Sequence, residues 1–260
     1  MSSRTVRSTA EIMGAFLGLL LALTLIGCAD VDASPNPSAS VPQAASTPSQ
    51  SVEPTSEHDL DALRNLPRSP RVLVIGDSFT EGYGASGPSA TWANIAGESL
   101  GWRAVIDGVG GTGFTKPLAT DGRTGMDFRS RIEQHAASGQ TFDLIVLQGG
   151  LNDVQATRAL EIANVNATIA IARRAWPDAA VIVFGPSSPP SSAAWRVHAA
   201  AIAEAAVDSG AVSIDPDGAE PWINTDNADR FALSDGLHLN DAGYLYLAAR
   251  FVAAVELLIS

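Results

Sequence analysis

Cysteine and lysine are nearly absent from this sequence, in which Cys28 and Lys116 are the single members of their kinds. A lone cysteine cannot form an intrachain disulfide. Acidic residues outnumber basic ones, 28 against 16, and the formal net charge at pH 7 is −12. A surface of that sign repels nucleic acid and anionic lipid headgroups, which disfavours functions that depend on a basic patch.

Patterns typical of metal and cofactor sites are also missing. No pair of His, Cys or carboxylate residues has metal-ligand spacing, so we expect neither metal catalysis nor a cofactor. The stretch GVGGTG, residues 108–113, has the glycine spacing of a dinucleotide cradle, but Pro117 and two further glycines follow it instead of a helix. Because no helix N-terminus faces a phosphate there, the dinucleotide interpretation is disfavoured.

Residues 1–27 have the architecture of a signal peptide. Arg4 and Arg7 precede the apolar run IMGAFLGLLLALTLIG, which is shorter than the ~20 apolar residues that a spanning helix needs. The run ends in LIGC, which resembles the bacterial lipobox, where the cysteine after the cleavage site is lipidated. We therefore predict lipidation at Cys28 and a protein anchored to the outer face of the cell membrane. A secreted form and an uncleaved apolar anchor are the alternatives.

Residues 28–68 are predicted to be a disordered tether. The segment is rich in Ser, Pro, Ala and Thr and has no aromatic residue, so it offers too little apolar surface to fold. As a flexible coil about 35 such residues span roughly 35 Å, and about 100 Å when fully polyproline-like. The tether would hold the catalytic domain away from the membrane.

Residues 69–260 are predicted to form the catalytic domain, in which apolar runs alternate with helical patterns. Apolar residues recur at helical spacing between residues 162 and 176 and again from 244 to 255. The second of these helices is preceded by an Asn-Asp pair that can serve as its N-cap. The candidate strands are continuously apolar, as in parallel sheets buried on both faces, and span residues 71–76, 103–107, 142–148, 180–184 and 211–214. The alternation predicts an α/β fold, a three-layer α/β/α sandwich with a mostly parallel five-stranded sheet. Its ligands would bind at the carboxyl ends of the strands.

A serine follows the first candidate strand, in GDSFTEG (residues 76–82). At a strand-to-helix turn, Ser78 can present its hydroxyl at the sheet edge with its own N–H facing the same cavity. A Ser/Asp helix cap is an equally good interpretation of this motif alone. The G-x-S-x-G elbow of the α/β-hydrolases is absent, because GPSSP after the fourth strand lacks the second glycine.

Two further loops carry polar residues at the same sheet edge. GGLND places the amide of Asn152 after the third strand, where it can donate to an oxyanion or simply form a turn. SDGLHLND places Asp235 three residues before His238, a spacing at which the carboxylate can orient the imidazole as a proton acceptor. The other histidines lack such a setting and are expected to be structural or solvated, namely His58, His135 and His198.

The blocks GDSFTEG, DGVGGTG, GGLND and DGLH occur in this order, and together they resemble the SGNH (GDSL-type) hydrolase family over about residues 71–260. The resemblance implies the flavodoxin-like fold of that family, with Ser78 as nucleophile, His238 as general base and Asp235 as its partner. It also implies an oxyanion hole made by the Ser78 N–H, the Gly111 N–H and the Asn152 amide, with Gly110 as the alternative glycine. Phe79 and Leu239 differ from the residues that are most frequent in the family's motifs, at positions without a catalytic role.

The resemblance implies a serine esterase that cleaves short acyl or O-acetyl esters through an acyl-enzyme. Its expected partners are a small acyl ester or an acetylated glycan and the membrane, and not nucleic acid. Two alternatives remain at this point. One is an acyltransferase that uses the same residues, and the other is a non-catalytic surface module that binds glycan.

Overall fold

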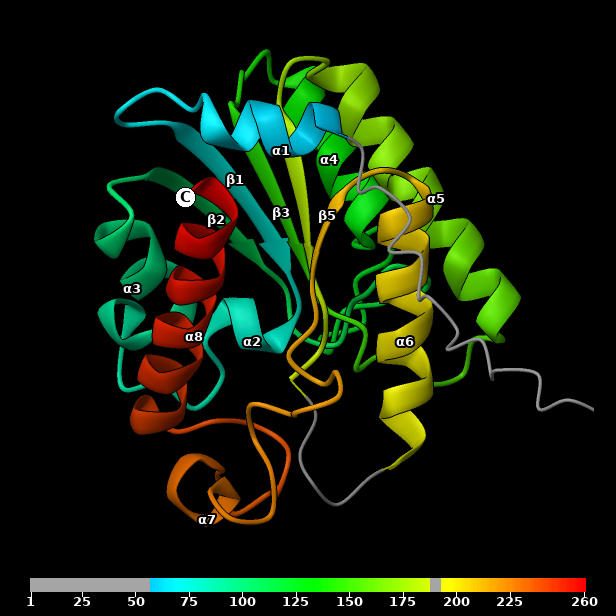
Figure 1. Cartoon of the computed structure of the whole chain (residues 1–260). Coiled ribbons are helices and arrows are strands. Elements are labelled where there is room, and N and C mark those ends of the chain that lie inside the picture. The colour runs from blue at the N-terminus through cyan, green and yellow to red at the C-terminus, as the bar shows by residue number, and fades with distance from the viewer. Residues whose placement is uncertain (1–56, 188–192) are drawn as a thin grey trace, which may run out of the picture. The chain divides into compact units, whose positions relative to one another are not determined.

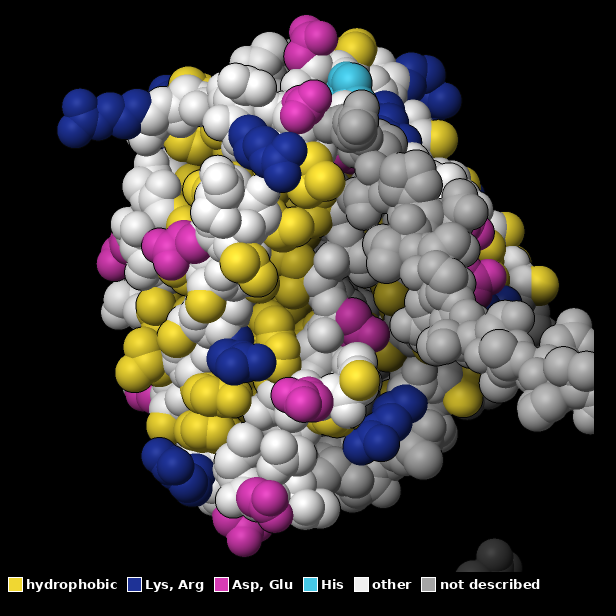
Figure 2. Space-filling model, in the orientation of Figure 1, with side chains coloured by type: hydrophobic (Ala, Val, Ile, Leu, Met, Phe, Trp, Pro, Cys, Tyr) yellow, Lys and Arg dark blue, Asp and Glu magenta, His cyan; other side chains and the backbone are white. Residues whose placement is uncertain are grey.

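The computed structural model describes residues 57–187 and 193–260. The predicted signal peptide, Cys28 and the tether up to residue 56 lie outside the described residues. On the face seen in Figure 2, basic side chains are scattered among acidic ones and form no patch in the part of the chain that is described.

Five strands form one parallel sheet in the order β2-β1-β3-β4-β5. They are β1 (Arg71–Gly76), β2 (Arg103–Gly108), β3 (Leu144–Gln148), β4 (Ala180–Phe184) and β5 (Val212–Ile214). The predicted fold class is confirmed, although β3 and β5 begin later than the expected residues 142 and 211. The strand order reverses between β1 and β3, so the loops that leave these two strands open a crevice at their carboxyl ends.

Helices cover both faces of the sheet, with α1, α3 and α8 on one side and α4, α5 and α6 on the other (Figure 1). Two short helices, α2 and α7, and a 3₁₀ turn, η1, lie in loops. The bounds are α1 (Glu57–Arg64), α2 (Ser78–Glu81), η1 (Pro88–Ala90), α3 (Trp92–Ser99), α4 (Phe128–Ala137), α5 (Arg158–Ala175), α6 (Ala193–Asp208), α7 (Ala228–Phe231) and α8 (Asp241–Ile259).

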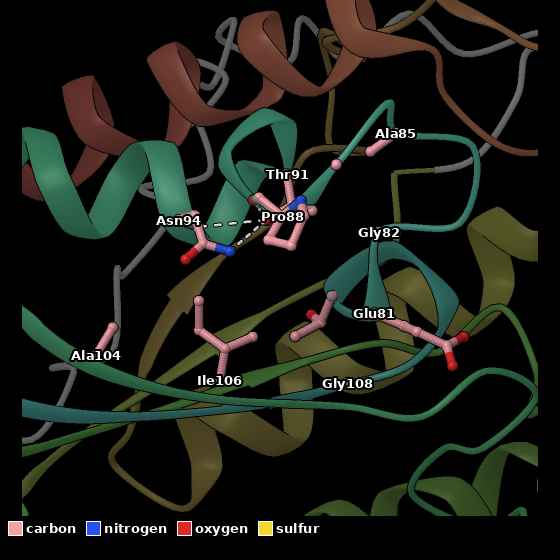
Figure 3. Close-up of a pocket in the computed structure, with 11 residues that line it drawn as sticks. Glu81, Gly82, Ala85, Pro88, Thr91, Asn94, Ala104, Ile106 and Gly108 are labelled. Carbon is pink, nitrogen blue, oxygen red and sulfur yellow. Dashed lines mark hydrogen bonds between the residues drawn. The ribbon is translucent and has the colours of Figure 1, made fainter.

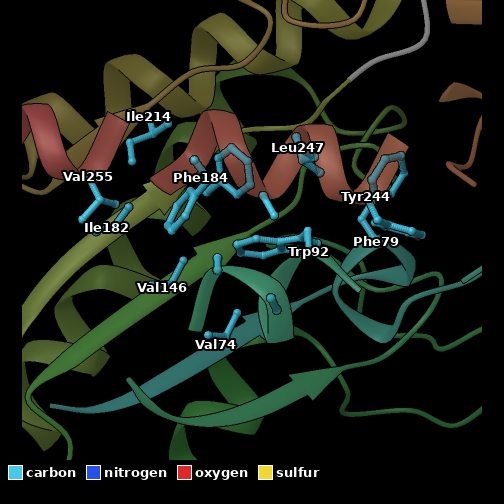
Figure 4. Packing of buried hydrophobic residues seen from close by; sticks show 14 of the residues in the cluster. Val74, Phe79, Trp92, Val146, Ile182, Phe184, Ile214, Tyr244, Leu247 and Val255 are labelled. Carbon is cyan, nitrogen blue, oxygen red and sulfur yellow. The ribbon is translucent and has the colours of Figure 1, made fainter. Parts of the chain in front are cut away.

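The continuously apolar strands supply two cores at once. In β1, Val72 and Val74 point to the α3 and α8 side, while Leu73 and Ile75 point to the α4 and α5 side. On the α8 side, Phe184 packs its ring 5.0 Å from that of Trp92 (Figure 4). Because both faces are buried, the carboxyl ends of the strands are held rigidly below the loops that follow them.

Local signals set the ends of the two long helices as the sequence predicts. Asn240 caps α8 by accepting the Gly243 N–H at 2.9 Å. The α5 helix ends at Ala175, two residues before Pro177, which cannot continue it. By length and composition, α8 is the one helix in the described residues that could cross a membrane, but its face with Tyr244, Leu247 and Phe251 is buried in the core.

The prediction of a tether up to residue 68 is wrong at its end, because α1 is folded onto the domain. Leu63 is buried among the core residues, and Asp59 is fully buried and pairs with Arg173 of α5 at 2.8 Å. The leucines at 60 and 63 give this short helix an apolar stripe. The average composition of residues 28–68 concealed that stripe, since Ser and Pro dominate the rest of the segment.

Candidate active site

Ser78 lies where β1 turns into α2, as its first helical residue. The Asp77 side chain caps this helix by accepting the Phe79 N–H at 2.9 Å. Glycine is required at position 76, because a Cβ there would come within 2.1 Å of Thr80 Oγ1. The Ser78 N–H has no acceptor in the described part of the chain, so it is available at the mouth of the turn.

Ser78, His238 and Asp235 are joined by two hydrogen bonds. His238 Nε2 lies 3.0 Å from Ser78 Oγ, and His238 Nδ1 lies 2.7 Å from Asp235 Oδ2. A carboxylate only accepts hydrogen bonds, so Nδ1 is the nitrogen that carries the proton, and in a neutral imidazole Nε2 is then free to accept one. The three side chains can therefore move a proton from the serine hydroxyl to the imidazole.

Hydrogen bonds to its own turn fix the Asp235 carboxylate. Its Oδ1 accepts the N–H groups of Leu237 at 2.9 Å and His238 at 3.0 Å. Slight burial raises the pKa of Asp235, but the hydrogen bonds from the His238 ring and from these two N–H groups outweigh it and lower the pKa to about 2. Asp235 thus stays a carboxylate throughout the neutral pH range.

Neighbouring segments position the His238 ring. The Leu233 N–H donates to the His238 carbonyl at 2.7 Å, and the ring of Tyr83 covers the imidazole with 4.3 Å between ring centroids. Phe79 approaches the imidazole from within the core, 5.8 Å away. These contacts leave the His238 side chain 15% exposed, enough to meet a substrate on one side.

The glycine loop after β2 makes a tight turn beside Ser78. The Thr112 N–H closes the turn on the Val109 carbonyl at 3.4 Å, and Gly111 has a positive φ of 78°. A Cβ at Gly111 would meet Thr120 Cγ2 at 2.7 Å, and one at Gly110 would meet Glu81 Oε2 at 2.6 Å. Neither glycine N–H has an acceptor within residues 57–187 and 193–260. The next helix begins only at Phe128, so the loop lacks the helix that a dinucleotide cradle requires.

Asn152 lies in the loop after β3 and reaches the glycine loop. Its Nδ2 donates to the Thr112 carbonyl at 2.9 Å, which uses one of two amide hydrogens and leaves the other for a ligand. Ser78, Gly110, Gly111, Asn152 and His238 all line one cavity of about 390 Å³. All the candidate residues predicted from the folded domain are therefore at this cavity or, like Asp235, directly bonded to a residue that lines it.

Two residues that were not predicted from the sequence hold these loops together. The buried Asp153 carboxylate accepts the N–H groups of Phe114 at 3.0 Å and Thr115 at 2.8 Å, tying the β3 loop to the glycine loop. The buried Arg131 guanidinium donates to the Gly76 carbonyl at 2.8 Å, just before Ser78. Asp153 could have been found from the sequence, because it adjoins Asn152 in the motif GGLND. Nothing in the sequence indicates that Arg131, a single arginine in a helix, is buried.

Other side chains that line the cavity were also missed, namely Glu81, Tyr83, Thr120, Leu151, Trp195 and Leu237. The remaining histidines lie elsewhere. His135 is bonded to Asp107 at 3.0 Å, His198 to the buried Glu161 at 2.5 Å, and His58 is largely exposed. In the described residues no group of three or more His, Cys, Asp or Glu side chains is placed to hold a metal ion.

Comparisons with known proteins point to one enzyme family. Residues 74–245 match the model of the GDSL-like lipase/acylhydrolase family. A GDSL lipase of Mycobacterium tuberculosis is 28% identical over 200 residues, which cover 72% of this chain and 81% of that protein.

Solved structures with this fold include three esterases. A carbohydrate acetylesterase family member from Sinorhizobium meliloti has a TM-score of 0.56 at 16% identity, covering 73% of this chain and 98% of that one. The M. smegmatis aryl esterase has a TM-score of 0.51 at 18% identity, with 73% and 100% covered. A family two carbohydrate esterase from Clostridium thermocellum, in complex with cellohexaose, has a TM-score of 0.58 at 17% identity, and the match covers 73% of this chain and 65% of that one. At these identities the likeness concerns the fold.

Proposed function

The chain belongs to the GDSL-like lipase/acylhydrolase (SGNH) family and is an esterase, and from that premise we propose that it cleaves short acyl esters through an acyl-enzyme formed on Ser78. The family that the sequence blocks predicted is confirmed, and a non-catalytic glycan-binding module is set aside. The proposal rests on one observation: Asp235, His238 and Ser78 are joined by successive hydrogen bonds at the cavity.

In the proposed reaction, His238 Nε2 removes the hydroxyl proton as Ser78 Oγ attacks the ester carbonyl carbon. Asp235 stabilises the imidazolium that forms, since it remains a carboxylate. The protonated Nε2 then gives its proton to the leaving alcohol as the C–O bond breaks. Water, activated by the same imidazole, hydrolyses the acyl-serine and restores the enzyme.

The negative charge that develops on the carbonyl oxygen needs hydrogen-bond donors. We assign the Ser78 N–H, the second hydrogen of Asn152 Nδ2 and a glycine N–H to this role. Gly111 is favoured over Gly110, because its positive φ makes the turn that presents this loop to the cavity. The glycine spacing that resembled a phosphate cradle is then explained by the approach of a backbone to an oxyanion.

The cavity supports a small acyl group. At about 390 Å³ it lies at the small end of the range for ligand sites, and polar side chains from three loops share its wall. The names of two structural neighbours, a carbohydrate acetylesterase and a carbohydrate esterase, favour acetylated glycans as substrates. A chain-length series of chromogenic esters should give a higher kcat/KM for acetyl to butyryl than for long acyl groups. An optimum at long chains with activation at a lipid interface would favour a lipase instead.

Ser78→Ala tests the nucleophile, with Ser99→Ala on the exposed side of α3 as the matched control. A fluorophosphonate probe should label the wild type and the Ser99 variant covalently and leave the Ser78 variant unlabelled and inactive. Wild-type turnover by the Ser78 variant would end the proposal. Product analysis with an added sugar acceptor separates hydrolysis from acyl transfer, because a transferase would pass the acyl group to the sugar hydroxyl.

For location, we propose a lipoprotein tethered to the outer face of the cell membrane. The support is the sequence alone: two arginines, an apolar run and LIGC before a Ser- and Pro-rich segment. An enzyme on such a tether meets cell-wall glycan esters and small soluble esters before it meets lipid.

A further inference from the structure

Glu81 brings a carboxylate to the catalytic cavity. It stands three residues after Ser78 on the single turn of α2, and both residues line the cavity. Its Oε2 lies against Gly110, 2.6 Å from where a Cβ on that glycine would be. The carboxylate therefore faces the turn whose N–H groups we assign to the oxyanion.

Within residues 57–187 and 193–260, no positively charged side chain pairs with this carboxylate. No arginine or lysine in the described residues lines the cavity, and the Glu81 side chain has no hydrogen bond or ion pair within that part of the chain. Among the described residues that line the cavity, the one basic group is the imidazole of His238, which is already hydrogen-bonded to Asp235 and Ser78. Glu81 is solvent-exposed, so water solvates its carboxylate until a donor group of a substrate replaces that water.

A second cavity, of about 500 Å³, lies on the other side of α2 and shares Glu81 with the catalytic cavity. Figure 3 shows that the Glu81 carboxylate points away from Ile106 and Pro88, which belong to the second cavity. Glu81 therefore lines both cavities, with its charged end on the side away from Ile106 and Pro88.

An unpaired carboxylate beside the oxyanion loop is unfavourable for catalysis on a simple ester. Like charges repel, so negative charge developing on the carbonyl oxygen is destabilised by the negative charge of Glu81. A hydrogen-bond donor on the substrate removes that penalty, because the carboxylate then has a partner in the complex. The side chain therefore penalises substrates that lack a donor and favours those that carry one.

We propose that Glu81 is a specificity-determining residue that accepts a hydrogen bond from a hydroxyl or ammonium group on the alcohol half of the ester. The inference rests on the proposed function, in which the acyl half is short. An acetyl group has no donor, so the donor must belong to the alcohol. Two aromatic side chains on the same cavity wall, Tyr83 and Trp195, suit either source, because rings of this kind contact both sugar C–H faces and cations. Alcohols with an anionic group beside the ester are disfavoured.

The test compares Glu81→Gln with the wild type on four acetyl esters: a phenyl ester without a donor, a neutral sugar ester, an amino-sugar ester and an ester of an anionic hydroxy acid. Glutamine keeps the shape and removes the charge. The ratio of kcat/KM for the neutral sugar ester to that for the phenyl ester should fall about tenfold, the difference between a charged and a neutral acceptor. The kcat/KM for the anionic ester should be higher in the variant than in the wild type. If the ammonium group is the true donor, the amino-sugar ester should lose more than the neutral one.

Glu98→Gln on the exposed part of α3 is the matched control and should leave all four ratios unchanged. Equal ratios in the Glu81 variant and the wild type would overturn the proposal. Fluorophosphonate labelling of Ser78 in the Glu81 variant separates that failure from failure of the proposed function. A labelled, active variant with unchanged ratios would refute the role of Glu81 alone.

Discussion

Asp153 is the strongest test of how the loops around the site are held. Its Oδ1 accepts from Thr115 N at 2.8 Å and Thr115 Oγ1 at 2.6 Å, and its Oδ2 accepts from Phe114 N at 3.0 Å. In Asp153→Asn the amide has one oxygen, which can keep the two bonds to Thr115. The NH₂ group of the asparagine then faces the Phe114 N–H. Both groups are hydrogen-bond donors, so the buried Phe114 N–H loses its acceptor.

The magnitude follows from these contacts. A buried N–H left without an acceptor costs about 1–3 kcal/mol, and each bond that changes from a charged to a neutral acceptor loses about 1 kcal/mol. Removing the negative charge of Asp153 offsets part of this loss of stability. The pKa values of Glu161 and Asp77 are raised mainly by burial and additionally by repulsion from Asp153, and that repulsion disappears in the variant. We expect a net loss of about 3 kcal/mol in the free energy of unfolding.

The assay is urea unfolding at neutral pH together with kcat for an acetyl ester. Asp121→Asn, in the loop between β2 and α4 and about half exposed, is the control and should change stability by less than about 0.5 kcal/mol. Because Asn152 adjoins Asp153, kcat should also fall by at least about tenfold when the two loops separate by a fraction of an ångström. A variant with wild-type kcat and a loss below about 1 kcal/mol would show that Asp153 does not hold the loops.

Three further predictions concern other parts of the chain. Asn152→Ala should lower kcat roughly a hundred- to a thousandfold, as loss of one oxyanion donor does, while lowering stability by only about 1 kcal/mol for the bond to Thr112; an unchanged pre-steady-state rate would remove Asn152 from the oxyanion hole. Burial, with repulsion from Asp153, raises the pKa of Glu161 from 4.5 to about 8, so the folded state retains a proton that the unfolded chain releases and stability should decline as pH rises through this window. Glu161→Gln should flatten that decline in urea midpoints measured at pH 5 and pH 8, and a slope equal to that of the wild type would contradict the assignment. Cys28→Ser should move the protein out of detergent-extracted membrane fractions, because the sequence offers no other lipid attachment; unchanged partitioning would indicate an uncleaved apolar anchor.

The sheet and the spacing of the site residues could be read from the sequence because both are local signals. A run such as RVLVIG identifies a strand buried on both faces, and DGLH places a carboxylate within reach of an imidazole inside one turn. The α1 helix was missed because its few apolar residues follow a long stretch that is rich in Ser and Pro. Glu81, Asp153 and Arg131 were missed for a different reason. Their roles depend on which loop packs against which, and that is decided by tertiary contacts far apart in the chain.

The place where α1 joins the domain has a mechanical consequence. Leu63 belongs to the same buried cluster as Val255, near the end of α8. The 19 residues of α8 separate this end from the His238 turn by roughly 28 Å. A force applied to the chain before residue 57 would therefore act first on α1 and on the end of α8. Through the ion pair of Asp59 with Arg173, it would also act on α5. The turns that carry Ser78, Gly111 and Asn152 lie outside this load path. A force applied at residue 57 would therefore leave the geometry of the site unchanged.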